Sequence, residues 1–414
     1  MPVDVTIVGG GMIVHDQILP SLYHLRRLGC LNRLVVCGVG SGALRALAAP
    51  PLAEAFPDQS FEAVPPLSTD PSDRDPNRYR AVVSAMAPGN LVVVAVPDHL
   101  HFEIVSFALE HNQHVLCVKP LVQKYAHARH IEQEARRRGL LVMVEYHKRF
   151  DRRALEARKS YRAGRFGEFR AGHACLVEPY YYRRSNFQNW FTPDRADPFT
   201  YVGCHYVDLV YFITGLRPAG VSVRGVAGTF PNGNSGWMWT SGQVVWENGG
   251  VLSVLNGLGY PDHGAGSNDQ GMSLFCEGAD RGAIIKHDDQ FRGVQHCYID
   301  AAGGASFRFI NPDYFRLVPW NGPGLRPVGY GYDSVEAAVH TVLRLGEAGP
   351  FDSAESLRRR QEILADIDAR GILATPANSF INELVTEGAR LSLAEHGAAV
   401  DIVYQPEPAV RLRR

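Results

Sequence analysis

The feature that most limits what this chain can fold into lies at its start, where an apolar run, Val3–Val8, leads directly into three consecutive glycines. Backbone N–H groups can approach a pyrophosphate closely only where no Cβ intervenes, and the positive end of a following helix attracts the phosphates. Gly9 and Gly11 match the first and second glycines of the pattern G-x-G-x-x-G, whereas Val14 stands in place of the third glycine. A turn with only a structural role is the alternative. We expect a dinucleotide to be bound by Gly9, Gly11, Met12 and Ile13.

Short β-branched runs alternate with helical stretches over the first 145 residues. Continuous apolar runs are typical of parallel strands that are covered on both faces. Strands are predicted at Val3–Val8, Arg33–Val39, Leu91–Val96, His114–Val118 and Leu140–Val144, with a further strand near Phe61–Val64. Strands that alternate with helices in this way predict a doubly wound parallel sheet with right-handed crossovers.

The pattern changes after about Lys148. Longer strands follow from residue 219 to about 320, with turn signals such as Gly303-Gly304, and they predict a mainly antiparallel open sheet with one face in need of cover. Helices are predicted at Arg153–Ala163, Tyr201–Thr214, Asp333–Leu345, Ala354–Arg370 and Asn378–His396, and the tail Val410–Arg414 is expected to be disordered. We therefore predict an α/β protein of two domains, residues 1–148 and residues 149–414.

The residues after the second predicted strand bear on the choice of cofactor. An acid at this place binds the ribose 2′-hydroxyl of NAD, whereas a small polar residue followed by a cation tolerates the 2′-phosphate of NADP. This chain has Ser41 and Arg45 and no acid, which favours NADP slightly over NAD. The alternative is that Arg45 is an ordinary solvated helix residue.

Composition excludes several classes of partner. The chain has 42 Lys and Arg against 43 Asp and Glu, a net charge of −1, so nothing favours nucleic acid or an anionic membrane. No apolar run is long enough to span a bilayer, and the N-terminus lacks the pattern of a signal peptide. The seven cysteines include no C-x-x-C pair, and His147, His173 and His287 have no ligand spacing. We expect a cytoplasmic protein without a metal site.

Four segments together carry a family resemblance: Leu91–His101 (LVVVAVPDHLH), Val115–Pro120 (VLCVKP), Val144–Phe150 (VEYHKRF) and Gly203–Asp208 (GCHYVD). They resemble the Gfo/Idh/MocA oxidoreductases, and the match runs in order along nearly the whole chain. The resemblance implies a Rossmann domain, a second α/β domain whose open sheet often makes subunit contacts, and NAD(P)-linked chemistry on sugars or polyols.

The chain departs from the family's motifs at several positions. The family's Glu-Lys-Pro is replaced in this chain by Val118-Lys119-Pro120, so that the acid is lost. The family's Asp-x-x-x-His is replaced by Tyr201-x-x-x-His205. A stretch that is usually Gly-Tyr-Asn-Arg-Arg-Phe-like becomes Glu145–Phe150. The resemblance also implies that Pro97, Asp98 and His101 line the nicotinamide ribose and that Asp208 matches a common acid.

Oxidation of an alcohol by a nicotinamide needs a base for the hydroxyl proton and a donor for the developing oxyanion. Lys119, at the end of a parallel strand, is expected to hydrogen-bond the reacting oxygen, and His205 to act as the general acid/base. Tyr201, His205 and Asp208 are spaced as one helical face, and Tyr201 is expected to replace the family's aspartate. The alternatives are structural roles: Lys119 would be a surface lysine with its stem packed, His205 a hydrogen-bonded core histidine, and Tyr201 a residue held by packing alone.

The loop from Glu178 to Trp190 is rich in Tyr, Arg and Asn, which suit the stacking and hydrogen bonding of a sugar. Arg183 and Arg184 would suit the carboxylate of a sugar acid, although a solvated cation pair is the more frequent case. The substrate is therefore expected to contact Lys119, Tyr182, Arg183, Trp190, His205 and Asp208.

These observations predict an NAD(P)-dependent oxidoreductase that acts on a hydroxyl or carbonyl group of a sugar, polyol or sugar acid. Two alternatives stay open. One is a relative that oxidises its substrate only transiently, as an epimerase, isomerase or lyase would, and the other is a dinucleotide-sensing regulator without turnover. Because the second sheet needs cover, we expect a homodimer or a homotetramer.

Overall fold

The structure is a computed structural model that describes residues 2–263, 268–279, 282–289, 297–300, 306–309 and 314–413. The chain forms two compact units. The first unit comprises Met1–Leu121, Ala126–Phe150 and Asp313–Asn378, and the second comprises Val122–Tyr125, Asp151–Pro312 and Ser379–Arg414. The predicted division at residue 148 lies close to one of these boundaries. It differs in assigning residues 313–378 to the second domain, because these residues pack with the first unit.

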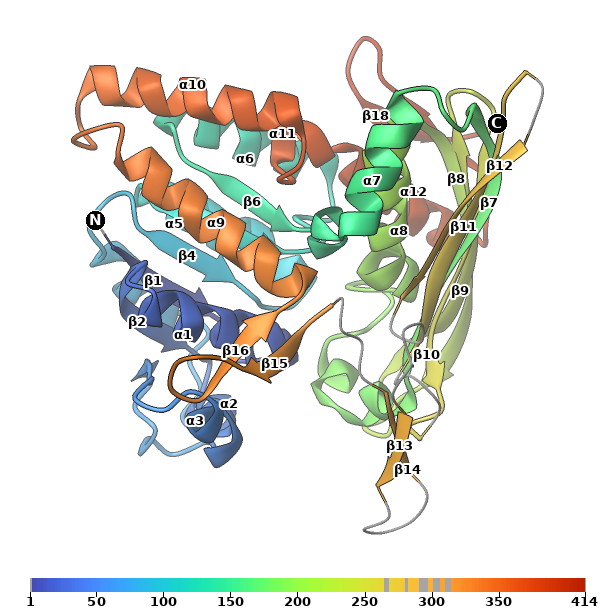
Figure 1. The fold of residues 1–414 in the computed structure, drawn as a ribbon. Coiled ribbons are helices and arrows are strands. Elements are labelled where there is room, and N and C mark those ends of the chain that lie inside the picture. Colours follow the sequence, from blue (N-terminus) through green and yellow to red (C-terminus); the bar gives the residue numbers. More distant parts are fainter. Residues whose placement is uncertain are drawn as a thin grey trace. The chain divides into compact units, whose positions relative to one another are not determined.

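The first unit is built on a six-stranded sheet in the order β3-β2-β1-β4-β5-β6, in which all neighbours are parallel (Figure 1). This order confirms the predicted doubly wound sheet. The strands are β1 (Val3–Val8), β2 (Leu31–Cys37), β3 (Glu62–Val64), β4 (Leu91–Val94), β5 (His114–Val118) and β6 (Val142–Glu145). The helices after them are α1 (Leu19–Arg27), α2 (Ser41–Leu47), α3 (Pro50–Ala55), α4 (Arg78–Ser84), α5 (His101–Glu110) and α6 (Tyr125–Arg138).

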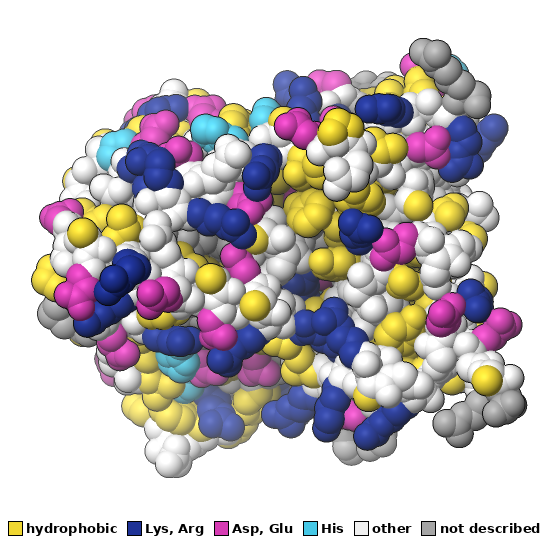
Figure 2. Space-filling model, turned by 90° about the horizontal axis from the view of Figure 1, so that it is seen from above, with side chains coloured by type: hydrophobic (Ala, Val, Ile, Leu, Met, Phe, Trp, Pro, Cys, Tyr) yellow, Lys and Arg dark blue, Asp and Glu magenta, His cyan; other side chains and the backbone are white. Residues whose placement is uncertain are grey.

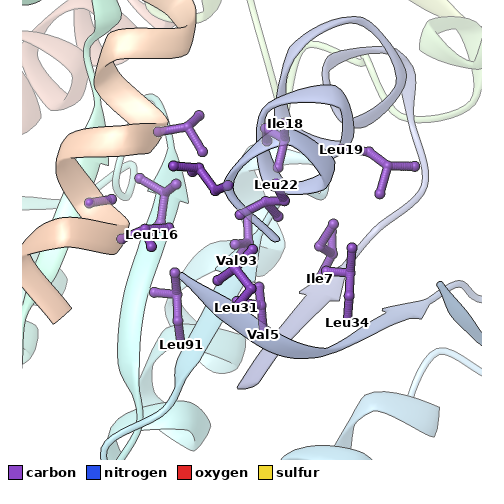
Figure 3. Close-up of a cluster of buried hydrophobic side chains, with 14 of the residues drawn as sticks. Val5, Ile7, Ile18, Leu19, Leu22, Leu31, Leu34, Leu91, Val93 and Leu116 are labelled. Carbon is purple, nitrogen blue, oxygen red and sulfur yellow. The ribbon is translucent and has the colours of Figure 1, made fainter. Parts of the chain in front are cut away.

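A buried apolar cluster of the first unit lies on one face of this sheet. Apolar side chains of β1, β2, β4 and β5 meet those of α1 and of the π-helical turn before it (Figure 3): Val5, Ile7, Leu31, Leu34, Leu91, Val93, Leu116, Ile18, Leu19 and Leu22. The same cluster includes a buried stripe on α9 (Tyr330–Gly346), namely Val335, Ala338, Val339 and Val342. The helical spacing of that stripe explains why the returning segment belongs to the first unit. The returning segment also contributes to the first unit β15 (Arg316–Pro319), β16 (Leu325–Val328), α10 (Ala354–Arg370) and α11 (Pro376–Ser379).

The second unit is built on an eight-stranded sheet in the order β12-β11-β7-β10-β9-β8-β17-β18. Only β7 and β10 pair in parallel, so the prediction of a large, mainly antiparallel sheet is confirmed. Its strands are β7 (Glu168–Pro179), β8 (Pro218–Thr229), β9 (Ser235–Trp246), β10 (Val251–Tyr260), β11 (Asp269–Glu277), β12 (Gly282–Asp289), β17 (Val400–Val403) and β18 (Ala409–Leu412). Its main helices are α7 (Arg152–Arg162), α8 (Cys204–Thr214) and α12 (Ile381–Ala394).

Two details of the second unit concern the predictions. The tail was expected to be disordered from Val410, which is wrong for its first residues, because Val410 in β18 pairs with Ile402 of β17. A two-stranded sheet joins β13 (Cys297–Asp300) and β14 (Ser306–Phe309). The turn predicted at Gly303-Gly304 between them lies outside the described residues.

One face of the eight-stranded sheet exposes apolar side chains. Leu255, Phe275 and Ile284 are 45%, 47% and 53% exposed. Phe275 pairs directly with Ile284 across β11 and β12, and the register through β7 brings Leu255 to the same face. Because side chains alternate along strands, the buried residues of these strands point to the opposite face. This sheet therefore has an uncovered apolar surface in the second unit.

Basic and acidic side chains are interspersed over the face of the molecule that Figure 2 presents. Among the described residues, no helix combines the length and the apolar character that a membrane span requires.

Candidate functional site

The glycine turn at the end of β1 has the close backbone approach that its sequence predicts. Gly9 has φ +118°, and a Cβ on it would lie 2.0 Å from the carbonyl oxygen of Ala95, which follows β4. Its N–H donates to the carbonyl of Cys37 at 2.8 Å. A Cβ on Gly11 would meet no atom within 4 Å. Gly9 is thus required by the protein's own packing, whereas the space at Gly11 suits a pyrophosphate.

The helix after this turn starts with a π-helical turn, Val14–Ile18, which no sequence signal indicated. Val14, at the place of the third glycine, is fully buried in the core of the first unit. Met12 is 37% exposed, and Ile13 packs against the same core. Val14 therefore belongs to the core and not to the exposed part of the turn.

The predicted ribose-reading residues are engaged within the protein. The buried hydroxyl of Ser41 donates to the carbonyl of Thr69 at 2.7 Å. The guanidinium of Arg45 donates to the carbonyls of Leu67 and Thr69, at 2.7 Å and 2.6 Å. Both side chains hold the loop after β3 against α2. These bonds use two of the five N–H donors of Arg45, so a contact with a 2′-phosphate would have to come from the others.

Lys119 follows β5 at the carboxyl edge of the parallel sheet, where ligands bind in folds of this kind. Its side chain is partly exposed, and the peptide bond to Pro120 is cis. His101 is fully buried, with its ring nitrogens 2.8 Å from the carbonyl oxygens of Pro120 and Val96. His101 thus connects the segments after β4 and β5, and its predicted cofactor contact has no support in these bonds. Pro97 is partly exposed.

A buried polar cluster at the same edge was missed by the sequence analysis. Glu145, the last residue of β6, accepts a hydrogen bond from Gln17 Nε2 at 2.9 Å and one from the hydroxyl of Ser334. Its other carboxylate oxygen lies 2.6 Å from Nδ1 of His147. Gln17 belongs to the π-helical turn and Ser334 to α9, so the cluster joins three distant parts of the sequence. The only local sequence signal for this cluster was an acidic residue, Glu145, at the end of an apolar strand.

In the second unit, three of the predicted site residues share one aromatic cluster. Tyr182, Trp190 and Tyr201 pack with Phe187 and Phe191. The ring of Tyr201 meets those of Phe187, Phe191 and Trp190 at centroid distances of 5.2, 5.6 and 5.8 Å. Packing therefore accounts for the position of the Tyr201 ring, and a catalytic role for its phenol stays a prediction.

The expected common face of Tyr201, His205 and Asp208 is modified by a second π-helical turn, Phe199–Gly203, which precedes α8. Tyr201 lies in that wider turn and faces the aromatic cluster. Asp208 is buried and accepts a hydrogen bond from the side-chain amide of Asn382 at 2.8 Å, so it orients α12. His205 is 6% exposed.

Arg183 was expected to meet a substrate carboxylate. Its Nε donates to the carbonyl of Leu258, and its guanidinium stacks 4.5 Å from the ring centroid of Tyr180. The neighbouring Arg184 lies 5.7 Å from the same ring. These contacts fix the loop on β10 and use part of the hydrogen-bonding capacity of Arg183.

Lys119 belongs to the first unit and His205 to the second, and their convergence on one oxygen stays a prediction. Within the described ranges, no cluster of three or more His, Cys, Asp or Glu side chains has the arrangement of a metal site.

Comparison with known proteins relates the first part of the chain to an enzyme family. Residues 3–146 match GFO_IDH_MocA, an oxidoreductase family with an NAD-binding Rossmann fold. Inositol 2-dehydrogenase 1 of Saccharopolyspora erythraea is 31% identical over 32% of this chain and 37% of its own length. D-glucoside 3-dehydrogenase of Escherichia coli is 27% identical over 54% of this chain and 57% of its length. The chain thus spans well under two thirds of either relative.

The fold extends over nearly the whole chain. An inositol dehydrogenase homologue of Azotobacter vinelandii, solved with NADH and myo-inositol, superposes with a TM-score of 0.61 at 18% identity, covering 97% of this chain and 98% of that one. At this identity the likeness concerns the fold alone. The match over residues 3–146 and the glycine turn at the end of β1 make this part of the chain similar to the NAD-binding Rossmann domain of that oxidoreductase family.

Proposed function

We propose that this protein is an NAD(P)-dependent dehydrogenase that oxidises a secondary hydroxyl of a sugar, polyol or sugar acid, or reduces the corresponding carbonyl. The observation that carries the proposal is the arrangement along one sheet edge: the open glycine turn follows β1, and Lys119 follows β5, two strands away. Ligands of doubly wound sheets bind at this edge, where the strand order reverses between β1 and β4.

The protein's own residues have separate tasks in this reaction. Gly9 shapes the turn, Gly11 lets the pyrophosphate approach the backbone N–H groups that follow, and the nicotinamide, when bound, supplies the hydride acceptor. Lys119 donates a hydrogen bond to the substrate oxygen and stabilises its developing negative charge. His205 accepts the hydroxyl proton, and Tyr182 and Trp190 offer aromatic surface to the sugar. The names of the inositol and glucoside dehydrogenases support a polyhydroxylated substrate.

The test compares Lys119→Met with Lys124→Met, a matched change at an exposed lysine of the same region. Both variants are assayed for NADH and NADPH formation with inositols, glucosides and aldonates. Loss of a positioned hydrogen-bond donor to the reacting oxygen is expected to lower kcat by about 100-fold or more in Lys119→Met, whereas kcat of Lys124→Met should be unchanged. Equal turnover of both variants would refute the role of Lys119. Substrate conversion without accumulation of reduced cofactor would indicate transient oxidation.

We further propose that the site accepts NADP as well as NAD. No carboxylate follows β2, where Gly38, Val39 and Gly40 stand, so a 2′-phosphate meets no direct repulsion from this turn. Dissociation constants for NADPH and NADH in Arg45→Ala test the part of Arg45. A selective loss of NADPH affinity supports a contact between Arg45 and the 2′-phosphate. If the wild type and Arg45→Ala bind NADPH with the same affinity, Arg45 takes no part in cofactor binding.

The uncovered apolar face of the eight-stranded sheet supports a proposal of self-association. Burial of Leu255, Phe275 and Ile284 against a second copy would remove apolar surface from water. Phe275→Glu is expected to lower the mass measured by light scattering to that of one chain, 45.6 kDa. Leu28→Glu, at an exposed leucine of the first unit, is the control.

A further inference from the structure

The turn after β2, where doubly wound domains read the adenosine ribose, has no room for an acidic side chain at its first position. A Cβ on Gly38 would lie 3.0 Å from the carbonyl oxygen of Gly40 and 3.1 Å from Cγ of Leu44, which is closer than ordinary van der Waals contact. The N–H of Gly38 donates to the carbonyl of Val64 at 2.9 Å, so this residue is fixed between two strands. A polar side chain that contacts the ribose 2′ position therefore has to come from another segment.

The loop after β3, residues 65–77, lies against this turn. The N–H of Asp75 donates to the carbonyl of Val39 at 3.0 Å. A Cβ on Gly40 would lie 3.4 Å from the carbonyl oxygen of Asp73. Two side chains of α2 also donate hydrogen bonds to carbonyls of the loop. The loop is thus held beside the place where the ribose is read, while the side chain of Val39 stays 42% exposed.

Arg74 of this loop packs its aliphatic stem on the turn. A Cβ on Gly40 would lie 3.7 Å from Cγ of Arg74, an ordinary packing distance. Arg74 is exposed, and no other residue that the structure describes forms a hydrogen bond or an ion pair with its guanidinium. All five N–H donors of this group are therefore available to an external anion. A guanidinium suits a phosphate because its donors can bind two oxygens at once.

The acidic residues of the loop are engaged with partners of their own. Asp73 forms an ion pair with Arg78 at 2.5 Å. Asp70 accepts hydrogen bonds from the N–H and the hydroxyl of Ser72, at 2.8 and 2.7 Å. Asp75 accepts the N–H of the residue two positions later at 2.8 Å. These bonds hold the three carboxylates within the loop and leave Arg74 as a cation that faces solvent beside the turn.

We propose that Arg74 is a cofactor-specificity residue, whose guanidinium binds the 2′-phosphate of NADP beside the turn after β2. The loop after β3 thereby takes over the reading of the ribose from a turn that has no polar side chain for it. This inference rests on the proposed dehydrogenase function and on its use of NADP. Arg45, with two N–H groups bound to carbonyls of the loop, holds that loop in position.

The test uses the full-length protein with Arg74→Gln and Arg74→Glu. Arg344→Gln is the matched control, because Arg344 is an exposed arginine of α9. Dissociation constants are measured by fluorescence titration for NADPH and NADH. They are measured by calorimetry for 2′,5′-ADP and 5′-AMP, which differ only in the 2′-phosphate. None of these measurements depends on turnover.

We expect Arg74→Gln to lower the affinities for NADPH and 2′,5′-ADP about tenfold or more, as is typical for the loss of a hydrogen bond to a charged group. The affinities for NADH and 5′-AMP should stay within twofold of the wild type. Arg74→Glu should weaken NADPH binding further, because it places a like charge near the phosphate. The control should bind all four ligands as the wild type does.

Equal NADPH affinity in the wild type and in a folded Arg74→Gln protein would overturn this inference while the proposed function stands. A wild type that binds 2′,5′-ADP no better than 5′-AMP would also overturn it, and that result needs no variant. A wild type that binds neither NADPH nor NADH would instead overturn the proposed function.

Discussion

A buried histidine of the first unit is expected to make the protein sensitive to mild acid. His114, the first residue of β5, is 1% exposed, and its Nδ1 accepts a hydrogen bond from the N–H of Leu141 at 2.9 Å. Burial, and to a smaller extent the charge of Arg360, lowers the pKa of His114 from 6.5 to about 3. The folded protein therefore keeps this imidazole neutral at a pH where the unfolded chain protonates it.

The sign and size of the effect follow from proton linkage. Below the ordinary pKa the unfolded state binds the extra proton, so the free energy of unfolding falls as the pH is lowered. Each pKa unit corresponds to about 1.4 kcal/mol. The contribution of His114 should thus fall by about 2 kcal/mol between neutral pH and about pH 5, and by about 4 kcal/mol near pH 3.5.

The assay compares the wild type with His114→Asn, whose Oδ1 can accept the same N–H but cannot be protonated in this range. Urea unfolding is followed by far-ultraviolet circular dichroism at neutral pH and at about pH 5. The variant loses packing at both pH values, so only the change in the difference between the two proteins is informative. That difference should shrink by about 2 kcal/mol on acidification. A difference that is constant with pH would refute the assignment of a neutral buried imidazole.

Three further predictions concern the two units. Gly9→Ala should destabilise the fold by roughly 3 kcal/mol or more in thermal unfolding, because its Cβ would strike Ala95, whereas Gly11→Ala should keep the stability and weaken NADH binding; equal stability losses would contradict this. Burial raises the pKa of Asp151, but hydrogen bonds from His287 and Arg153 outweigh it and hold that pKa well below its usual range. Asp151→Asn should therefore cost about 3 kcal/mol at neutral pH, and the deficit should disappear as the pH falls through the range where the wild-type carboxylate is protonated. Tyr201→Phe should lower kcat if the phenol replaces the family's aspartate, and unchanged turnover would leave the ring with packing alone.

The sequence predicted those parts of the fold whose signals are local. The glycine turn after β1 and the apolar parallel strands were found because each is encoded by neighbouring residues. The two π-helical turns were missed, because one extra residue in a turn leaves the helical spacing of apolar side chains almost unchanged. The strand β18 was missed because its stability comes from pairing with β17, which the composition of a short tail does not reveal.

The candidate site divides in the same way. Lys119 lies where the strand pattern placed it, at the carboxyl end of β5. Ser41 and Arg45 were assigned from their position after β2, but their bonds to the loop after β3 depend on residues more than twenty positions away. The Glu145 cluster combines Gln17, His147 and Ser334, which only the folded chain brings together.

The return of residues 313–378 to the first unit has a consequence for synthesis on the ribosome. When the first 150 residues have emerged, the stripe of α9 that shares a buried cluster with Val93 and Leu116 has not yet been translated. The dinucleotide-binding half must wait for more than half of the remaining polypeptide before its sheet is sealed from water. A gene fragment ending near residue 150 would encode all six parallel strands. The apolar surface that packs against α9 in the folded protein would stay exposed in this fragment and would favour aggregation.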